Sequence, residues 1–205
     1  LRGADFVPFS DESAEELRIA LIAEAALRGD RSVVYAYERE LDHCGHVHGC
    51  SSANWLQQLA RIDAMCERLR AALPSQVTVI ITGDHGMVDI PSEQRIVAED
   101  DPALMAGLSA LAGEGRFRQF YVDREPPRRV AERWRARLGD LAWVRTRDEA
   151  IDEGWFAAID DQLRERWGHV LVALRGDWAI MTSAFPREFT LIGMHGSLTP
   201  AEMLV

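Results

Sequence analysis

Hydrophobic and polar positions in residues 10–82 form blocks that predict helix, strand, helix and strand in that order. The stretch 10–30 is rich in Ala and Leu, has Ser13 and Glu16 at capping-box spacing and ends near Gly29, which predicts a helix. Val and Tyr residues at 33–37 predict a short strand. Apolar residues then recur every three or four positions from 55 to 73, which predicts a helix ended by Pro74. The unbroken apolar run at 77–82 predicts a second strand, covered on both faces.

This order of elements predicts an α/β layered fold with a mainly parallel sheet. After residue 90 the pattern changes and predicts a strand at 118–123, a helix at 126–140 and a strand at 142–146. Apolar runs at 168–174 and 177–182 flank Arg175-Gly176 and predict a hairpin. We therefore interpret residues 1–114 with 186–205 as an α/β core and residues 115–185 as a small α+β insertion or cap.

Charge and composition narrow the classes of partner. The 205 residues carry a formal net charge of −10, which argues against a nucleic-acid groove because such a groove needs a basic patch. No apolar run is long enough to span a bilayer, so we expect no membrane partner. The three cysteines are too few for a disulfide framework, which favours a reducing compartment and predicts a cytoplasmic protein.

Polar residues cluster at three places where apolar runs end. Asp84 and His85 follow the run 77–82 between two glycines, Asp42 and His46 follow the first predicted strand, and His195 follows a short apolar run. Ligands of open parallel sheets bind beyond the carboxyl ends of the strands, so these clusters are expected to converge. Mixed imidazole and carboxylate ligands suit zinc, with manganese as the alternative.

Each cluster also has a simpler interpretation. An Asp-His pair after a strand is commonly a turn in which the Asp accepts from a nearby amide, and a lone glycine-flanked His is commonly a surface residue. A small zinc knuckle is a further alternative, built from His43, Cys44, His46, His48 and Cys50. Structural zinc sites usually use two Cys pairs, which favours the strand-end interpretation over the knuckle.

At these residues the sequence resembles the alkaline phosphatase superfamily, and within it the type I phosphodiesterase/nucleotide pyrophosphatase group. The similar elements are D-x-x-G-H at 42–46, Gly-Asp-His-Gly-Met at 83–87 and His195-Gly196, in the order of the family. The resemblance implies that Asp42, His46 and His195 bind one metal and that Asp84 and His85 bind a second. It covers most of residues 30–90 and 190–205, whereas the middle segment resembles no family segment.

One element of the family pattern has no counterpart in residues 1–30. In the family, an early segment supplies a metal-binding Asp and a Thr or Ser nucleophile at a helix N-terminus. We therefore assign no catalytic nucleophile in this chain and expect it upstream. The chain is interpreted as the C-terminal portion of such an enzyme, N-terminally truncated and inactive alone.

The resemblance implies a metal-dependent phosphodiesterase or phosphatase. Its expected substrates are small-molecule phosphate esters or nucleotides, including nucleotide-type diesters. Its expected cofactors are two divalent metal ions, with Zn²⁺ favoured over Mn²⁺. The alternative is a non-catalytic metal-binding or regulatory module. Loss of an N-terminal strand and helix would also expose a sheet edge, which predicts self-association.

Overall fold

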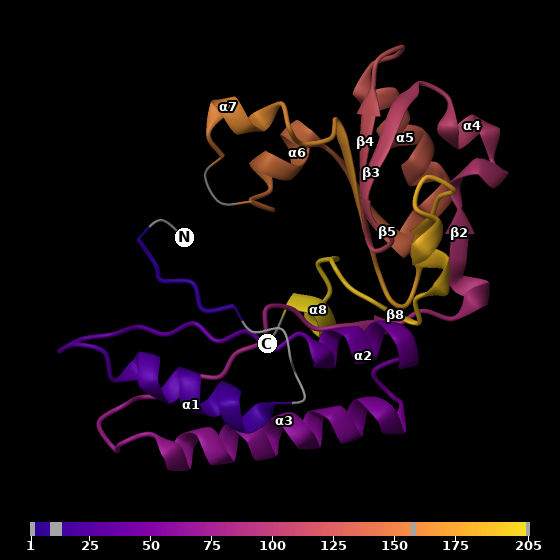
Figure 1. Ribbon diagram of the computed structural model, residues 1–205. Helices are drawn as coiled ribbons and strands as arrows, with labels where there is room; N and C mark the ends of the chain where they lie inside the picture. Colours follow the sequence, from indigo (N-terminus) through magenta and orange to yellow (C-terminus); the bar gives the residue numbers. More distant parts are fainter. Residues whose placement is uncertain (1–2, 9–13, 157–158, 204–205) are drawn as a thin grey trace.

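A computed structural model describes residues 3–8, 14–156 and 159–203 (Figure 1). Its first part is helical, with α1 at Glu15–Ala26, α2 at Glu40–His48 and α3 at Ala53–Ala72. The strands that follow are β1 Val88–Asp89, β2 Arg95–Val97, β3 Leu108–Glu114, β4 Phe117–Val122, β5 Ala142–Thr146, β6 Val170–Leu174, β7 Ala179–Met181 and β8 Gly193–Met194. The later α-helices are α4 Pro102–Met105, α5 Pro127–Leu138, α6 Arg147–Asp152, α7 Asp161–Arg164 and α8 Pro200–Met203. Short 3-10 helices lie at Ser92–Gln94, Ala98–Asp100, Gly139–Leu141 and Pro186–Thr190.

The predicted helices in the first part of the chain are confirmed. The Ser52 hydroxyl accepts a hydrogen bond from the Trp55 amide at 3.1 Å and so begins α3. The guanidinium of Arg70 donates to the carbonyls of Leu73 and Pro74 beyond its end. Helix α1 is present at Glu15–Ala26, although Ser13 of the expected capping box lies outside the described residues.

The main core lies between α5 and a four-stranded antiparallel sheet of order β3-β4-β6-β5. The side chain of Trp134 is fully buried on the inner face of α5, packs against Phe120 at 4.5 Å between ring centroids and donates to the Leu104 carbonyl. All five residues of β6 are buried because this strand is paired on both edges and covered on its faces. The expected helix at 126–140 and strand at 142–146 are confirmed as α5 and β5. The expected boundary after residue 114 falls within the β3–β4 hairpin.

The predicted hairpin of 168–174 with 177–182 is wrong. Both runs are strands, but β6 pairs with β4 and β5, whereas β7 pairs in parallel with β2. Two apolar runs joined by Arg175-Gly176 look like a hairpin in sequence. Each run instead pairs with strands from elsewhere in the chain, and the local sequence pattern does not predict such long-range pairing.

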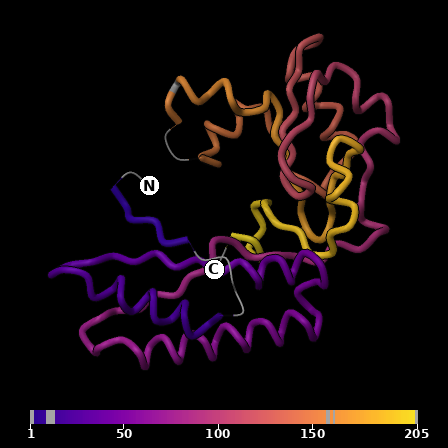
Figure 2. Tube along the Cα trace, in the orientation of Figure 1, coloured from indigo at the N-terminus to yellow at the C-terminus, as the bar shows by residue number. Residues whose placement is uncertain are grey.

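The predicted strands at 33–37 and 77–82 are also absent from the described sheets. Residues 31–39 form an extended trace that joins no sheet (Figure 2). Val33 is fully exposed, and Ile80 and Ile81 are exposed at 84% and 72%. A strand needs a neighbouring strand to pair with, and no strand pairing is recorded for these segments in the described part of the chain. The mainly parallel sheet is therefore corrected to a mixed α/β fold with small, mostly antiparallel sheets.

We call α1 to α3 the helical layer, and the elements from β2 to the 3-10 helix at Pro186–Thr190 the sheet unit. The two meet along the C-terminal segment, which lies between them in Figure 1. Strand β8 in this segment pairs with β1, and residues of α8 contact both units. Across the described residues, no helix combines the length and apolar character needed to cross a membrane. Asp42 and His46 of α2 and His195 of the C-terminal segment lie at this junction.

Candidate metal centre

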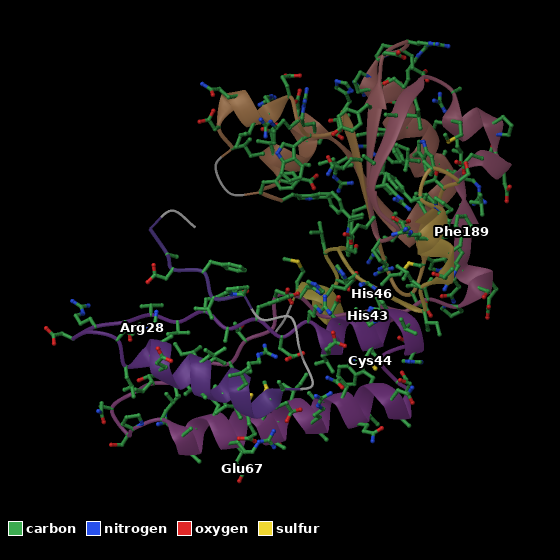
Figure 3. The ribbon with its side chains drawn as sticks, in the orientation of Figure 1. Arg28, His43, Cys44, His46, Glu67 and Phe189 are labelled. Carbon is green, nitrogen blue, oxygen red and sulfur yellow. The ribbon has the colours of Figure 1, made fainter. Side chains whose placement is uncertain are left out.

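Helix α2 carries Asp42 and His46, whereas the sequence pattern predicts them at the end of a strand. Residues four apart lie on the same face of a helix, and the Asp42 Oδ2 to His46 Nε2 distance is 3.5 Å. His46 is labelled on α2 in Figure 3, close to the C-terminal segment. The prediction that these two residues follow a strand is therefore wrong, because both belong to one turn of α2.

The segment around β8 brings His195 to this face of α2. The Ile192 amide donates to the His46 carbonyl at 2.7 Å, and His46 Nδ1 lies 2.8 Å from the Gly193 carbonyl oxygen. These contacts place His195 Nε2 3.7 Å from Asp42 Oδ1. The structure thus gathers one oxygen and two nitrogens, all within 4.8 Å of one another, from Asp42, His46 and His195.

Two glycines allow this close approach of chain segments. A Cβ at Gly193 would lie 2.6 Å from the Gly45 carbonyl oxygen, so only glycine lets β8 approach α2 so closely. A Cβ at Gly86 would lie 1.9 Å from the Ala201 carbonyl oxygen, and the Gly86 amide donates to the Glu202 carbonyl at 2.9 Å. Residues 84–87 are therefore held directly against α8.

His85 joins the centre through its ring, and Asp84 lies at its edge. The imidazoles of His85 and His195 stack with 3.7 Å between centroids and 20° between planes. His85 Nδ1 lies 3.0 Å from the Gly86 carbonyl oxygen, and its Nε2 lies 3.7 Å from Asp84 Oδ1. The Asp84 side chain is 59% exposed. Neither residue belongs to the group of three, so their role as ligands of a second metal stays a prediction.

The surroundings favour the neutral form of His195. Burial and the neighbouring His85 lower the pKa of His195 below its ordinary value of 6.5, although the carboxylates of Glu114 and Asp42 act in the opposite direction. A neutral imidazole is the form that binds metal ions. The Tyr37 phenol lies in the field of Asp84 and Asp42, and burial together with these charges raises the pKa of its hydroxyl.

The three gathered residues fit a divalent metal ion. Asp42 Oδ1 is buried and accepts no hydrogen bond, and leaving a buried carboxylate oxygen unpaired is costly. The Nδ1 of His46 faces a carbonyl oxygen, so its Nε2 lone pair is free to point toward Asp42. One carboxylate and two imidazoles are a donor set typical of zinc. The knuckle alternative receives no support, because the group of three found among the described residues contains neither Cys44 nor Cys50.

A cavity of about 160 Å³ opens beside the centre. Its walls include both imidazoles of the group and two carboxylates that the sequence analysis did not select, and it is lined by His46, Glu114, Gly115, Glu188, Leu191, Met194 and His195. Glu188 forms an ion pair with the buried guanidinium of Arg118. Neither glutamate has a motif around it, so only the fold shows that they lie here.

The comparison with family models identifies the class of protein. Residues 4–198 match the type I phosphodiesterase / nucleotide pyrophosphatase model, which is nearly the whole chain. The chain therefore belongs to the type I phosphodiesterase/nucleotide pyrophosphatase family of the alkaline phosphatase superfamily. The match runs through the middle segment, where the sequence analysis found no family element.

Solved structures share the fold of this chain. Two structures of murine ectonucleotide pyrophosphatase/phosphodiesterase 5, one of them an inactive variant in complex with AMP, align with a TM-score of 0.72 at 20% identity. The human protein of the same name aligns with a TM-score of 0.69 at 19% identity. In each case the alignment covers 93% of this chain and 50% of the other, so this chain spans half the length of those structures.

Curated relatives match over a shorter stretch. The catalytic subunit of GPI ethanolamine phosphate transferase 3 is 32% identical over 59 residues, both in Homo sapiens and in Mus musculus. The match covers 29% of this chain and 5% of either relative. A match over so small a part of either relative carries no residue roles.

Proposed function

We propose that this protein hydrolyses phosphate esters, with nucleotide-type diesters as the expected substrates, at a two-metal centre. The observation that carries the proposal is the convergence of Asp42, His46 and His195, together with the buried, unpaired oxygen of Asp42. Membership of a family of phosphoric ester hydrolases supports the reaction class. The AMP complex of the murine relative supports a nucleotide ligand. We favour zinc over manganese, and a cytoplasmic location.

In this proposal Asp42, His46 and His195 hold one metal ion, and Asp84 and His85 contribute to a second. Bound divalent metal ions supply Lewis acidity and local positive charge to the phosphoryl group. The Gly193 carbonyl accepts the Nδ1 proton of His46 and so directs the Nε2 lone pair inward. The lowered pKa of His195 keeps its imidazole neutral at pH 7. The cavity beside His46 and His195 is the expected place of the leaving group.

Zinc content tests the proposal most directly. After zinc loading and desalting, elemental analysis of the wild-type chain is expected to give about one retained zinc or more, and His195→Ala is expected to lose the zinc held by the group of three. His48→Ala is the matched control, since His48 is an exposed histidine at the end of the same helix. Equal zinc content in wild type and His195→Ala would overturn the assignment of these ligands.

Turnover of an activated diester such as bis(p-nitrophenyl) phosphate tests the reaction class. In the intact protein, Asp84→Asn and His195→Ala are each expected to lower kcat/KM by about 100-fold or more, because each removes a proposed ligand of the metal ions that would stabilise the developing charge. Near-normal rates in both variants would contradict the two-metal proposal. Zinc retention without any turnover in the intact protein would favour the non-catalytic alternative.

The curated relatives favour a second candidate, transfer of a phosphoryl-linked group to an alcohol instead of water. The observation is the 32% identity over 59 residues to an ethanolamine phosphate transferase. In this candidate the same centre would be used and only the acceptor would differ. Product analysis in the presence of an added alcohol separates them, because transfer yields a phosphate ester of the added alcohol whereas hydrolysis yields a phosphate without it.

A further inference from the structure

His195 lies between two carboxylates that come from different parts of the fold. Its Nε2 is 3.7 Å from Asp42 Oδ1 and its Nδ1 is 3.6 Å from Glu114 Oε2. The two nitrogens of a neutral imidazole have opposite roles, since one carries the proton and the other carries the lone pair. The partner of one nitrogen therefore decides which nitrogen is available to a metal.

The fold holds Glu114 at this place. Glu114 is the last residue of β3 and pairs with Phe117 across a tight turn. Arg116, within that turn, is fully buried and forms an ion pair with Glu202 of α8, seven residues after His195. The same Glu202 carboxylate accepts from the Ser197 amide at 3.0 Å, so the turn next to Glu114 and the segment next to His195 share one anchor.

Other glutamates of the sheet unit differ from Glu114 in their partners. Glu125, Glu149, Glu153 and Glu188 each form an ion pair with an arginine. The ion pair recorded for Glu114 in the described part of the chain is the one with His195. Its carboxylate also lies against the backbone of Gly196, where an added Cβ would be 3.4 Å from Oε2. The arginines of the sheet unit named above pair with other glutamates, and the recorded ion-pair partner of the Glu114 carboxylate is His195.

His46 provides the comparison within the same centre. The Gly193 carbonyl oxygen lies 2.8 Å from its Nδ1, which leaves Nε2 for the inner face of the group. No equivalent carbonyl contact is recorded for His195 among the described residues, and Glu114 occupies the corresponding position. The 3.6 Å distance between His195 Nδ1 and Glu114 Oε2 is longer than a hydrogen bond, and the Glu114 side chain is 63% exposed, so the hydrogen bond requires a small rotation of this side chain.

We propose that Glu114 is a positioning residue for His195, accepting the proton of Nδ1 and so directing the Nε2 lone pair toward the position shared with Asp42 and His46. This inference rests on the proposed function, because it concerns the same metal centre. It also assigns the small antiparallel sheet a part in the centre, since the end of β3 supplies the carboxylate. The centre then contains residues from both parts of the chain, with Asp42 and His46 on α2 and Glu114 at the end of β3.

Zinc affinity of single variants tests the inference. Dissociation constants are measured by competition with a chromophoric chelator for wild type, Glu114→Ala and Glu114→Gln. We expect Glu114→Ala to weaken zinc binding by about 10- to 100-fold, the usual effect of removing the partner of a ligating histidine. Glu114→Gln retains a side-chain oxygen acceptor and is expected to recover most of the affinity. Glu132→Ala is the control, because Glu132 is an exposed glutamate of α5 whose ion pair with Arg128 lies on the same helix.

A second readout reports on the imidazole itself. Long-range ¹H–¹⁵N spectra of the zinc-loaded protein distinguish a proton on Nδ1 from a proton on Nε2. We expect His195 to carry its proton on Nδ1 in wild type and in Glu114→Gln, and to show a weakened or exchanging Nδ1 proton in Glu114→Ala. A change of overall stability alone would not alter this signal.

The outcomes separate this inference from the proposed function. If wild type binds zinc, His195→Ala loses it and Glu114→Ala stays within about twofold of wild type, the role of Glu114 is overturned and the metal centre stands. Equal losses in Glu114→Ala and Glu114→Gln would also overturn it, because the acceptor would then be irrelevant. If wild type binds no zinc, the proposed function fails and this inference fails with it.

Discussion

The thiol of Cys50 is partly buried beside a carboxylate, and both conditions are expected to suppress its reactivity. Its amide donates to Asp89 Oδ1 at 2.6 Å, so the thiol is held beside a negative charge. Burial, together with the charges of Asp89 and Asp42, raises the pKa of Cys50 to about 11 from an ordinary value of 9.0. This thiol is therefore expected to be protonated and inert at neutral pH.

Alkylation as a function of pH checks this expectation. In a Cys44→Ser/Cys66→Ser variant, Cys50 is the remaining thiol, and its rate with iodoacetamide at pH 8 is expected to be roughly 100-fold below that of a free thiol. The rate should rise with pH until about pH 11. The same variant unfolded in guanidinium chloride is the control and should react at the ordinary rate. A rate plateau near pH 9 in the folded protein would contradict the raised pKa.

The same shift has a consequence for stability. The folded-state pKa of Cys50 lies above its unfolded value, so the unfolded chain loses the thiol proton first as the pH rises. The contribution of Cys50 to stability is therefore fully present below pH 9 and is lost as the pH rises from 9 to about 11. Replacing Cys50 by Ala should flatten the pH dependence in that window.

At the scale of elements, the Arg116–Glu202 ion pair joins the β3–β4 hairpin to α8. Both side chains are almost completely buried, and Arg116 contributes two hydrogen bonds, at 3.0 Å from Nε and 2.6 Å from Nη2. Glu202 also accepts from the Thr199 hydroxyl and from the Ser197 amide. A buried charge that loses its partner lowers the free energy of unfolding, so this contact is expected to contribute strongly to the packing of the β3–β4 hairpin against α8.

Removal of one partner tests the importance of this contact. Arg116→Met is expected to lower the free energy of unfolding by about 3–5 kcal/mol, because it leaves the Glu202 carboxylate buried without a positively charged partner. Arg128→Ala, which breaks an exposed ion pair on α5, is the control and is expected to cost less than about 1 kcal/mol. Urea denaturation of both variants gives the comparison. A loss below about 1 kcal/mol for Arg116→Met would show that the pair is dispensable.

At the scale of the whole molecule, two extended apolar segments are left uncovered. Val33, Tyr35, Ile80 and Ile81 are all largely exposed, and residues 31–39 and 77–82 belong to no described sheet. Tyr35 and Tyr37 stack on one side of the first segment, as side chains two apart do in an extended chain. Exposed apolar side chains next to unpaired backbone groups favour pairing with another chain.

We therefore expect this chain to self-associate. Sedimentation velocity over a range of protein concentrations should show oligomers in wild type, and Val33→Glu/Ile80→Glu should shift the distribution toward the monomer, because charges on these segments oppose contact. Leu56→Glu is the control, since Leu56 is an exposed apolar residue of α3 outside the two segments. A wild-type chain that stays monomeric at all concentrations would contradict the expectation.

Elements with strong local signals were the ones that the sequence predicted well. Helix α3 has a serine cap and a regular apolar period, α5 begins with proline and keeps one apolar face, and β5 coincides with the predicted strand. These features depend on neighbours a few residues away, so they are readable without the fold. Asp42 and His46 were selected from their residue types, but the sequence pattern placed them at the end of a strand, whereas they lie on one turn of α2.

Strand partners and the completion of the site were decided only by the tertiary structure. The runs at 33–37 and 77–82 have the composition of strands, yet a strand exists only where another segment accepts its hydrogen bonds. In the same way β7 pairs with β2 and not with its neighbour β6. The meeting of His195 with Asp42, and the approach of Glu114 to His195, depend on the close contact of α2, β8 and the β3–β4 turn. Local sequence determines which residues could bind a metal, and long-range packing determines which of them meet.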